Sequence, residues 1–302
     1  MGIIYHNKPE MKSPILLAAW PGIGNVGIIT LATLRDQLGA GVLADIEPEE
    51  FFYPAGVNIK NGVQQELRFP LSCFYYQQWC GQDIVIFMGD EQPADGQNTY
   101  AQGSRAYNMA NRVLDVAEEL GCQRIITFGA AVTMTHHKIK PKVWAVANNK
   151  KFLNTIQERM PAELKSSLAG KNFVANISGL NGLLLGVANK RNMSAACLMG
   201  EIPDYLSHLP LVYPHASRST LEALRYVIRI SVDLFRMDES VKEVDEMIAD
   251  MYSRFPELVR QKLDNRFHTN ENRGISDDDE KWLKENINDF FKKDHNQNEH
   301  GS

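Results

Sequence analysis

Short apolar runs alternate with longer amphipathic stretches along the first two thirds of the chain. The apolar runs are rich in β-branched side chains, which is typical of strands buried on both faces of a sheet. The predicted strands are Ile15–Trp20, Val42–Ile46, Asp83–Asp90, Arg124–Ala131, Val143–Asn148, Phe173–Ile177 and Ala195–Met199. The stretches between them have helical periodicity, and the predicted helices are Asn25–Leu38, Gln97–Leu120, Lys151–Leu168 and Asn181–Arg191. This alternation predicts a three-layer α/β fold in which helices cover a mixed, largely parallel central sheet.

One segment, residues 51–78, interrupts the alternation. It carries Asn61-Gly62 between two runs of alternating polarity, which is typical of a tight β-hairpin turn. We therefore predict an α/β core domain over residues 1–236, with a hairpin inserted near residues 51–78.

The chain becomes helical after Pro214, and its apolar residues form two stripes. A helix that is apolar on two sides must be covered on two sides, which predicts a contact with another subunit as well as with the core. The first stripe is Leu221, Leu224, Ile228, Val232 and Phe235, and the second is Val227, Ile230 and Leu234.

Two further segments follow the core domain. Residues 237–265 are predicted to form a helical extension that Asp238 would cap. Its apolar stripe is Val244, Met247, Met251 and Phe255. Residues 266–302 predict a polar tail with a short amphipathic helix between Trp282 and Phe291. A docking helix on a tether and a packed C-terminal helix are both consistent with this tail.

The composition excludes several classes of protein. A net charge of −5 and a pI near 5.9 argue against a nucleic-acid partner. The longest nearly uncharged segment, "FVANISGLNGLLLGVANK", is interrupted by polar residues and too short for a membrane span, and no leader-like run opens the chain. The cysteines, Cys73, Cys80, Cys122 and Cys197, have neither paired nor ligand-like spacing. We therefore expect a cytoplasmic protein without a metal or cofactor.

A literal G-x-G-x-x-G occurs at Gly22, Gly24 and Gly27, between a predicted strand and a predicted helix. Asp45 follows near the tip of the second strand, where a dinucleotide-binding protein places its ribose ligand. Two features oppose that interpretation. Trp20-Pro21 precedes the first glycine, which removes a backbone donor, and "ADIEPEEFFYP" leads into a proline-bounded loop where a helix belongs. We expect a structural or anion-binding loop rather than a nicotinamide or flavin site.

Several blocks of sequence, taken in order, resemble a known family. They are "WPGIGNVG", "DIEPEEFFYP", "FMGDEQP", "TFGAAVTMTHHKIKPKVWAVAN", "ISGLNGLLLGVA" and "GEIPDYL", and together they cover roughly residues 12 to 236. This order resembles the proteasome assembly chaperone family of the second type, in its bacterial and archaeal branch. The resemblance implies a fold similar to the nucleoside phosphorylase and hydrolase sandwich, a homotrimer, and a protein-binding, assembly-chaperone-like role with an unknown partner.

The chain departs from that family at its C-terminus. Proteasome-docking relatives can end in a hydrophobic–tyrosine–any residue tail, whereas this chain ends in Glu299-His300-Gly301-Ser302. Docking to a proteasome through the C-terminus is therefore in doubt.

Polar residues gather where the predicted strands end, which is where open α/β sheets bind ligands. Asp90, His136, His137 and Glu201 are the candidate catalytic residues, since carboxylates and histidines act as general acids and bases. The candidate ligand- or anion-binding residues are Gly22, Gly24, Asn25, Ser178, Gly179 and Asn181. Each has an equally concrete structural alternative, as a cap, a turn or a backbone hydrogen-bond partner.

Three hypotheses for the function follow. The first is a homotrimeric protein-binding or assembly factor, as the resemblance implies. The second is an enzyme or sensor for a nucleoside or a phosphorylated metabolite, with its site at the carboxyl ends of the strands. A dinucleotide oxidoreductase is the least supported. The chain has no H-E-x-x-H, G-x-S-x-G or Walker lysine motif, so the sequence names no reaction.

Overall fold

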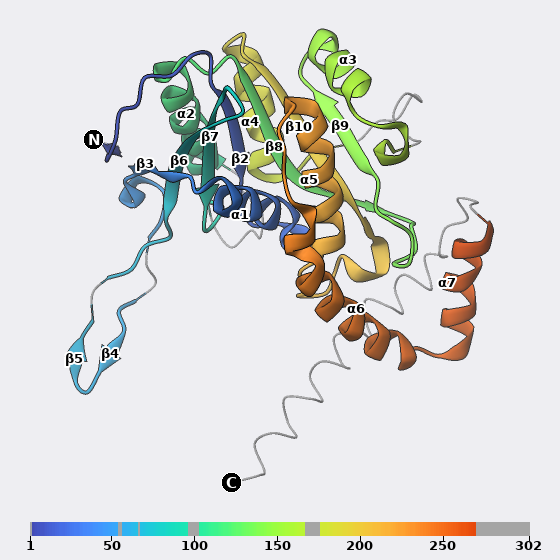
Figure 1. Cartoon of the computed structure of the whole chain (residues 1–302). Coiled ribbons are helices and arrows are strands. Elements are labelled where there is room, and N and C mark those ends of the chain that lie inside the picture. The colour runs from blue at the N-terminus through green and yellow to red at the C-terminus, as the bar shows by residue number, and fades with distance from the viewer. Residues whose placement is uncertain (1, 54–55, 66, 96–102, 167–175, 270–302) are drawn as a thin grey trace.

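The computed structural model describes residues 2–53, 56–65, 67–95, 103–166 and 176–269, and side chains up to residue 265. An eight-stranded sheet forms its centre, with helices on both faces (Figure 1). Across the sheet the strands are β1 (Ile3–Tyr5), β3 (Gly41–Ile46), β6 (Ser72–Trp79), β7 (Gln82–Gly89), β2 (Ile15–Ala19), β8 (Arg124–Thr133), β10 (Ser194–Pro203) and β9 (Val143–Ala147).

The sheet is mixed, and most of its described strands share one direction. The four strands β7, β2, β8 and β10 are mutually parallel. Strand β3 runs the same way, because it is antiparallel to β6, which is antiparallel to β7. The opposing strands are β6 and the two edge strands, β1 and β9. The predicted α/β fold with a mixed, largely parallel sheet is confirmed.

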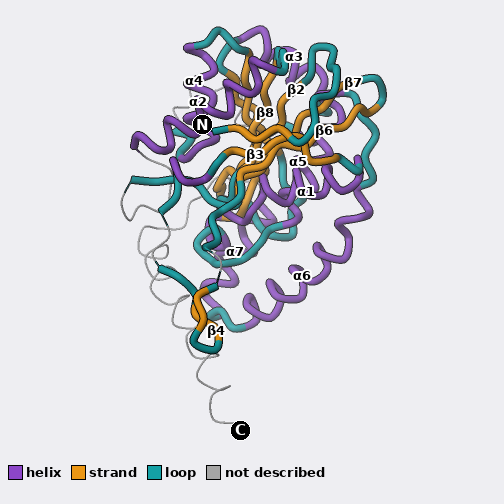
Figure 2. The backbone as a smooth tube through the Cα atoms, turned by 90° about the vertical axis from the view of Figure 1, so that its left-hand side faces the viewer, coloured by secondary structure: helices purple, strands orange, loops and turns teal. Residues whose placement is uncertain are grey.

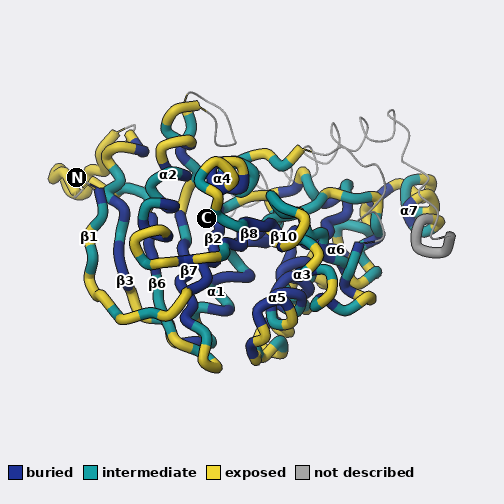
Figure 3. The backbone as a smooth tube through the Cα atoms, turned by 90° about the horizontal axis from the view of Figure 1, so that it is seen from above, coloured by how far each residue is buried: buried dark blue, intermediate teal, exposed yellow. Residues whose placement is uncertain are grey.

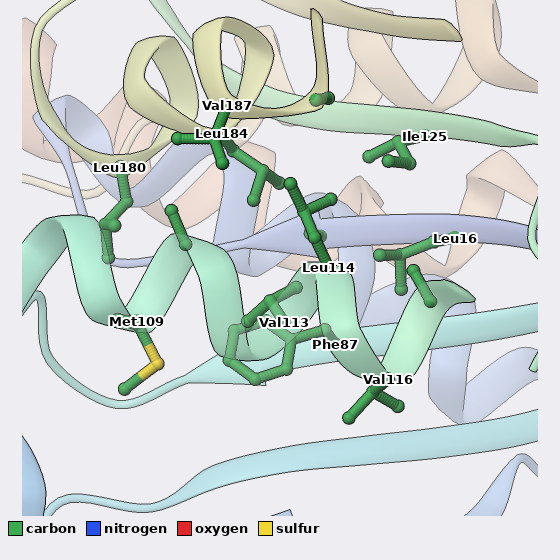
Figure 4. Packing of buried hydrophobic residues seen from close by; sticks show 14 of the residues in the cluster. Leu16, Phe87, Met109, Val113, Leu114, Val116, Ile125, Leu180, Leu184 and Val187 are labelled. Carbon is green, nitrogen blue, oxygen red and sulfur yellow. The ribbon is translucent and has the colours of Figure 1, made fainter. Parts of the chain in front are cut away.

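The helices divide between the two faces. One face carries α2 (Gly103–Glu119) and α4 (Gly179–Lys190), whose side chains pack on Leu16, Phe87 and Ile125 of the sheet (Figure 4). The other face carries α1 (Val26–Leu38), α3 (Lys150–Arg159) and α5 (Pro214–Ile228). All of β2 is buried because helices cover it on both sides, and Figure 3 shows the buried strands at the centre of the molecule.

Three predicted elements need correction. The helix predicted over Lys151–Leu168 ends at Arg159, because Met160 is extended before Pro161, and proline disfavours helical backbone in the residue before it. Of the strand predicted over Phe173–Ile177, residues 173–175 lie outside the described residues, and Asn176 and Ile177 belong to no strand. Strands β1 and β6 were not predicted, because β1 has only 3 residues and polar residues interrupt the apolar pattern of β6.

The helix predicted to reach Phe235 ends at Ile228. Arg229 has a φ of 58°, and this left-handed residue stops α5. The two stripes therefore do not share one helix. Leu221, Val227 and Ile230 are buried within the chain in the core beneath α1, α3 and α5, whereas Phe235 is 77% exposed. The premise of one helix that is apolar on two sides therefore fails, while the subunit contact itself stays a prediction.

A helical extension follows α5. It consists of α6 (Asp238–Ser253) and α7 (Glu257–Thr269), which lead away from the sheet (Figure 1). Asp238 is the first residue of α6 and not its N-cap, which is Met237, and its carboxylate pairs with Arg218 at 3.0 Å. The buried stripe contains Val244 and Ile248, whereas Met247 is exposed. The helix predicted between Trp282 and Phe291 lies outside the described residues.

A small hairpin stands apart from the main sheet. Strands β4 (Ile59–Lys60) and β5 (Val63–Gln64) pair with each other around Asn61-Gly62, both of which have positive φ. The hairpin projects away from the body in two perpendicular views (Figure 1, Figure 2). We call residues 53 and 56–71, where described, the arm.

Candidate functional site

A cavity of about 650 Å³ opens at the carboxyl ends of β2 and β8. After β2 the chain crosses towards β3, whereas after β8 it continues on the opposite side of the sheet, towards β9 and β10. Two neighbouring strands whose connections diverge leave a crevice between their ends. Pairing between β2 and β8 stops at Thr127, while β8 continues to Thr133 beside β10. The cavity occupies this topological switch point.

The glycine loop forms one wall of the cavity. Gly22 borders it in an extended conformation, and a side chain there would meet open space. Gly27 also borders it, but a Cβ at Gly27 would lie 2.5 Å from the carbonyl oxygen of Phe128, so this glycine lets α1 approach β8. Gly24 has a φ of 59° and packs against Ile202 and Tyr213, away from the cavity. Asn25, with a φ of 50°, precedes α1 and makes no capping bond.

Gln92 fastens the glycine loop to the start of α4. Its amide nitrogen donates to the carbonyl of Pro21 at 2.6 Å, and its amide oxygen accepts from the backbone N–H of Leu180 at 2.9 Å. Gly179 has a φ of 74°, and a Cβ there would lie 2.7 Å from the Gln92 amide oxygen. A glycine is therefore required where Gln92 crosses, and Gly179 has a packing role.

Ser178 and Asn181 border the cavity from the first turn of α4. Ser178 makes no capping bond to the helix. The Asn181 Oδ1 atom is buried and has no hydrogen-bond partner among the described residues.

Glu201 lies behind the cavity wall. Its buried carboxylate accepts hydrogen bonds from Trp144 Nε1 at 2.9 Å, Ser166 Oγ at 2.9 Å and the backbone N–H of Lys142 at 3.3 Å. The carboxylate oxygens are therefore already hydrogen-bonded within the chain. Trp144 borders the cavity, so Glu201 positions an aromatic ring of the wall.

The two histidines lie in a separate cluster. His136 is fully buried, and its Nε2 lies 3.4 Å from the Tyr252 hydroxyl and 3.6 Å from Asp264 Oδ1. His137 Nδ1 lies 2.7 Å from the hydroxyl of Tyr205. Burial and the neighbouring His136 lower the pKa of His137 to about 4, so this ring is neutral at pH 7. The histidines tie the loop after β8 to the helical extension and do not border the cavity.

Asp90 forms hydrogen bonds with the backbone of a neighbouring segment of its own chain. Its carboxylate accepts from the backbone N–H of Leu71 at 3.0 Å, and its own N–H donates to the Leu71 carbonyl at 2.8 Å. Of the candidate ligand-binding residues, the cavity brings together Gly22, Ser178 and Asn181, and Gly27 of the glycine motif also borders it. None of the four catalytic candidates borders it. Trp144, which does, escaped prediction because a tryptophan in a strand is typical of a core residue.

The described lining of the cavity carries no charged side chain: it contains no Asp, Glu, Lys, Arg or His. Within the same described part of the chain, no cluster of three or more His, Cys, Asp or Glu side chains has the arrangement of a metal site. No described helix is long and apolar enough to cross a membrane.

The geometry is thus that of an α/β protein with a cavity at a topological switch point. The PAC2 family model matches residues 16–252, so the chain belongs to the PAC2 family. This confirms the resemblance seen in the sequence.

Similar proteins come from archaea and bacteria. PbaB of Pyrococcus furiosus, solved as an archaeal proteasome activator, superposes with a TM-score of 0.69 and 24% identity over 82% of this chain and 97% of its own. The Mycobacterium tuberculosis proteasome-assembly chaperone homologue Rv2125 gives a TM-score of 0.63 and 18% identity, over 81% and 98%. The protein MJ1210 of Methanocaldococcus jannaschii is 21% identical over 83% of this chain and 87% of its own. The structural similarity confirms the fold.

Proposed function

We propose that this protein is a homotrimeric, protein-binding factor with an assembly-chaperone-like role in the cytoplasm. Membership of the PAC2 family supports the proposal, as do the names of similar proteins. PbaB is described as a proteasome activator and Rv2125 as a proteasome-assembly chaperone homologue. By these descriptions PbaB acts on another protein assembly, and Rv2125 resembles a factor that does. We extend that class of activity to this chain.

The observation that carries the proposal is the arm. Apart from Phe69, which packs against the core, its large apolar side chains are exposed, from 42% at Leu67 to 70% at Ile59. A two-stranded hairpin has little stability of its own in water, and an apolar surface on a projecting element is typical of a protein-binding site. The exposed apolar residues of the arm are Tyr53, Val57, Ile59, Val63, Leu67 and Leu71. We infer that the arm contacts another protein, either a neighbouring copy in the trimer or the partner.

Two measurements test this proposal. Light scattering of the full chain should give about three times the 34.1 kDa of one copy, and a mass of one copy at micromolar concentration would contradict the trimer. The double variant Ile59→Ser, Val63→Ser should lose trimer formation or the capture of specific proteins from the native host. Leu258→Ser, which removes an exposed leucine outside the arm, is the matched control. If the arm variant keeps both the mass and the captured proteins of the wild type, the arm is not the binding surface.

A further inference from the structure

The dipeptide Asn-Gly occurs twice in the chain, at Asn61-Gly62 and at Asn181-Gly182. An asparagine is prone to deamidation when the backbone nitrogen of the next residue can attack its side-chain carbon, Cγ. A side chain on that next residue hinders the attack, and glycine has none. Both sites therefore have the same intrinsic chemistry, and the structure around each one decides whether the reaction proceeds.

The structure around Asn181 opposes the reaction. Asn181 is the third residue of α4, where the helical hydrogen bonds fix the backbone angles. Gly182 packs closely against Ile177, because a Cβ at this glycine would clash with the Ile177 carbonyl oxygen. Ring closure requires a different backbone angle at the asparagine, and that rotation would unwind the start of α4. We therefore expect Asn181 to be protected.

The structure around Asn61 permits the reaction. Asn61 and Gly62 form the exposed two-residue turn between β4 and β5, with φ values of 53° and 74° (Figure 2). Among the described residues, no hydrogen bond holds the Asn61 side chain or the Gly62 N–H. Each strand has only 2 residues, and so small a hairpin opens readily in water. The backbone of the turn can therefore rotate into the geometry of ring closure.

We propose that Asn61, at the tip of the arm, is a site of spontaneous deamidation. The backbone nitrogen of Gly62 forms a bond to Cγ of Asn61 while the Cγ–Nδ2 bond breaks, and the proton of the Gly62 N–H leaves with the side-chain nitrogen as ammonia. Water then opens the resulting cyclic imide at either of its carbonyl carbons. The product is aspartate or isoaspartate, in which the main chain passes through Cγ. No electrons are transferred, and water is the only co-reactant.

The conversion changes both the charge and the shape of the arm. A carboxylate replaces a neutral amide next to Lys60, and isoaspartate adds a main-chain atom to the turn that sets the pairing of Lys60 with Val63. The effect on binding rests on the proposed function: because Ile59 and Val63 lie beside this turn, conversion should weaken the contact of the arm with another protein.

Peptide mass spectrometry of the full chain tests the proposal. The chain is incubated near neutral pH, either folded or unfolded in guanidinium chloride, at a low concentration so that few neighbouring copies cover the arm. Cleavage after acidic residues places the two sites in separate peptides, 51–66 and 164–201. Deamidation adds about 1 Da, and fragment ions assign it to a residue. Asn58, in the same peptide as Asn61 but followed by the β-branched Ile59, is an internal control that should not convert.

In the folded chain Asn61 should convert at least about tenfold faster than Asn181, whereas in the unfolded chain the two rates should be similar. The proposal is overturned if folded Asn61 stays unconverted over the time in which unfolded Asn61 converts. Equal conversion of Asn61 and Asn181 in the folded chain would also overturn it, because the structure would then not select the arm.

The variant Asn61→Gly locates the modification and tests its consequence. It removes the amide and keeps a turn that suits a two-residue hairpin, so its peptide 51–66 should gain no mass. A gain in that peptide would assign the modification to another residue and refute the proposal. After equal incubation, the wild type should lose association or captured proteins, whereas Asn61→Gly should retain them, and equal behaviour would refute the effect on binding. If the fresh wild type neither associates nor captures protein, the proposed function fails, while the mass measurement still decides whether Asn61 is modified.

Discussion

The cavity and the histidine cluster lie only a few residues apart along β8 and its following loop, yet they are built in opposite ways. Gly129–Val132 border a cavity whose described lining carries no charged side chain. His136 and His137 follow at once, and each contacts a tyrosine from another element. One region is open and, in its described part, uncharged, while the other is titratable and closed by its own chain.

This difference shows that a residue type suited to catalysis is not always free to contact a ligand. Histidines and carboxylates are the residues that carry acid–base chemistry, but in this protein Glu201, Asp90 and His137 already bind groups of their own chain. Amides, glycines and apolar side chains line the cavity instead. The predictions below test this contrast between closed and open groups.

The largest effect is expected at Glu201. Glu201→Leu removes the acceptor of Trp144 Nε1 and Ser166 Oγ and leaves these donors without the carboxylate. Each orphaned buried donor costs about 1–3 kcal/mol, so the free energy of unfolding in urea should fall by roughly 3 kcal/mol or more. Glu201→Gln keeps one acceptor oxygen and should cost about 1 kcal/mol. Equal losses in the two variants would show that the carboxylate is not the anchor of Trp144.

Two glycines of the loop provide the next contrast. Gly27→Ala forces a Cβ to within 2.5 Å of the Phe128 carbonyl oxygen, and relief requires a shift of α1 or β8. Overpacking of this kind costs about 1–3 kcal/mol, measurable as a lower melting temperature in calorimetry. Gly22→Ala meets open space and should change the free energy of unfolding by less than about 0.5 kcal/mol. A similar loss of stability in both variants would contradict the conclusion that Gly27 is tightly packed and that Gly22 faces open space.

Acid should weaken the histidine cluster. His137 has a folded-state pKa of about 4 against an ordinary value of 6.5, so the unfolded chain binds the proton more tightly. Its contribution to stability is therefore fully present above about pH 6.5 and is lost as the pH falls towards 4. The whole shift corresponds to about 3 kcal/mol, and solvent screening of this partly buried ring reduces the expected loss to about 1–2 kcal/mol.

The measurement compares urea unfolding of the wild type and His137→Gln between pH 7 and pH 4. His215 also has a pKa lowered by burial, and both proteins retain it, so the difference between them reports His137 together with its coupling to His136. The variant should show the shallower decline in the free energy of unfolding with pH. Parallel declines would mean that His137 is protonated equally easily in the folded and unfolded chains.

The sequence predicted the sheet better than the site, for physical reasons. A strand such as Ile15–Ala19 is buried on both faces, and its continuous apolar run is visible without knowledge of the fold. The end of α5 was missed because Arg229 has no side-chain signal for a left-handed backbone. Ser178 and Asn181 border the cavity because α4 begins at Gly179, close to the helix start predicted at Asn181. The pairing of Trp144 with Glu201 joins two strands and could not be predicted from residue spacing.

The smallest effect on the folded monomer is expected from the arm, where Ile59 is 70% exposed and Val63 is 63% exposed. Ile59→Ser with Val63→Ser removes side chains that bury little area in their own chain, so the free energy of unfolding of the isolated subunit should change by less than about 0.5 kcal/mol. A contact with another copy makes stability depend on concentration, because association stabilises the folded form. Melting temperatures of the wild type should therefore rise with protein concentration, while those of the double variant should rise less. If the variant loses stability equally at all concentrations, the arm packs on its own chain in solution and is not a binding surface for another protein.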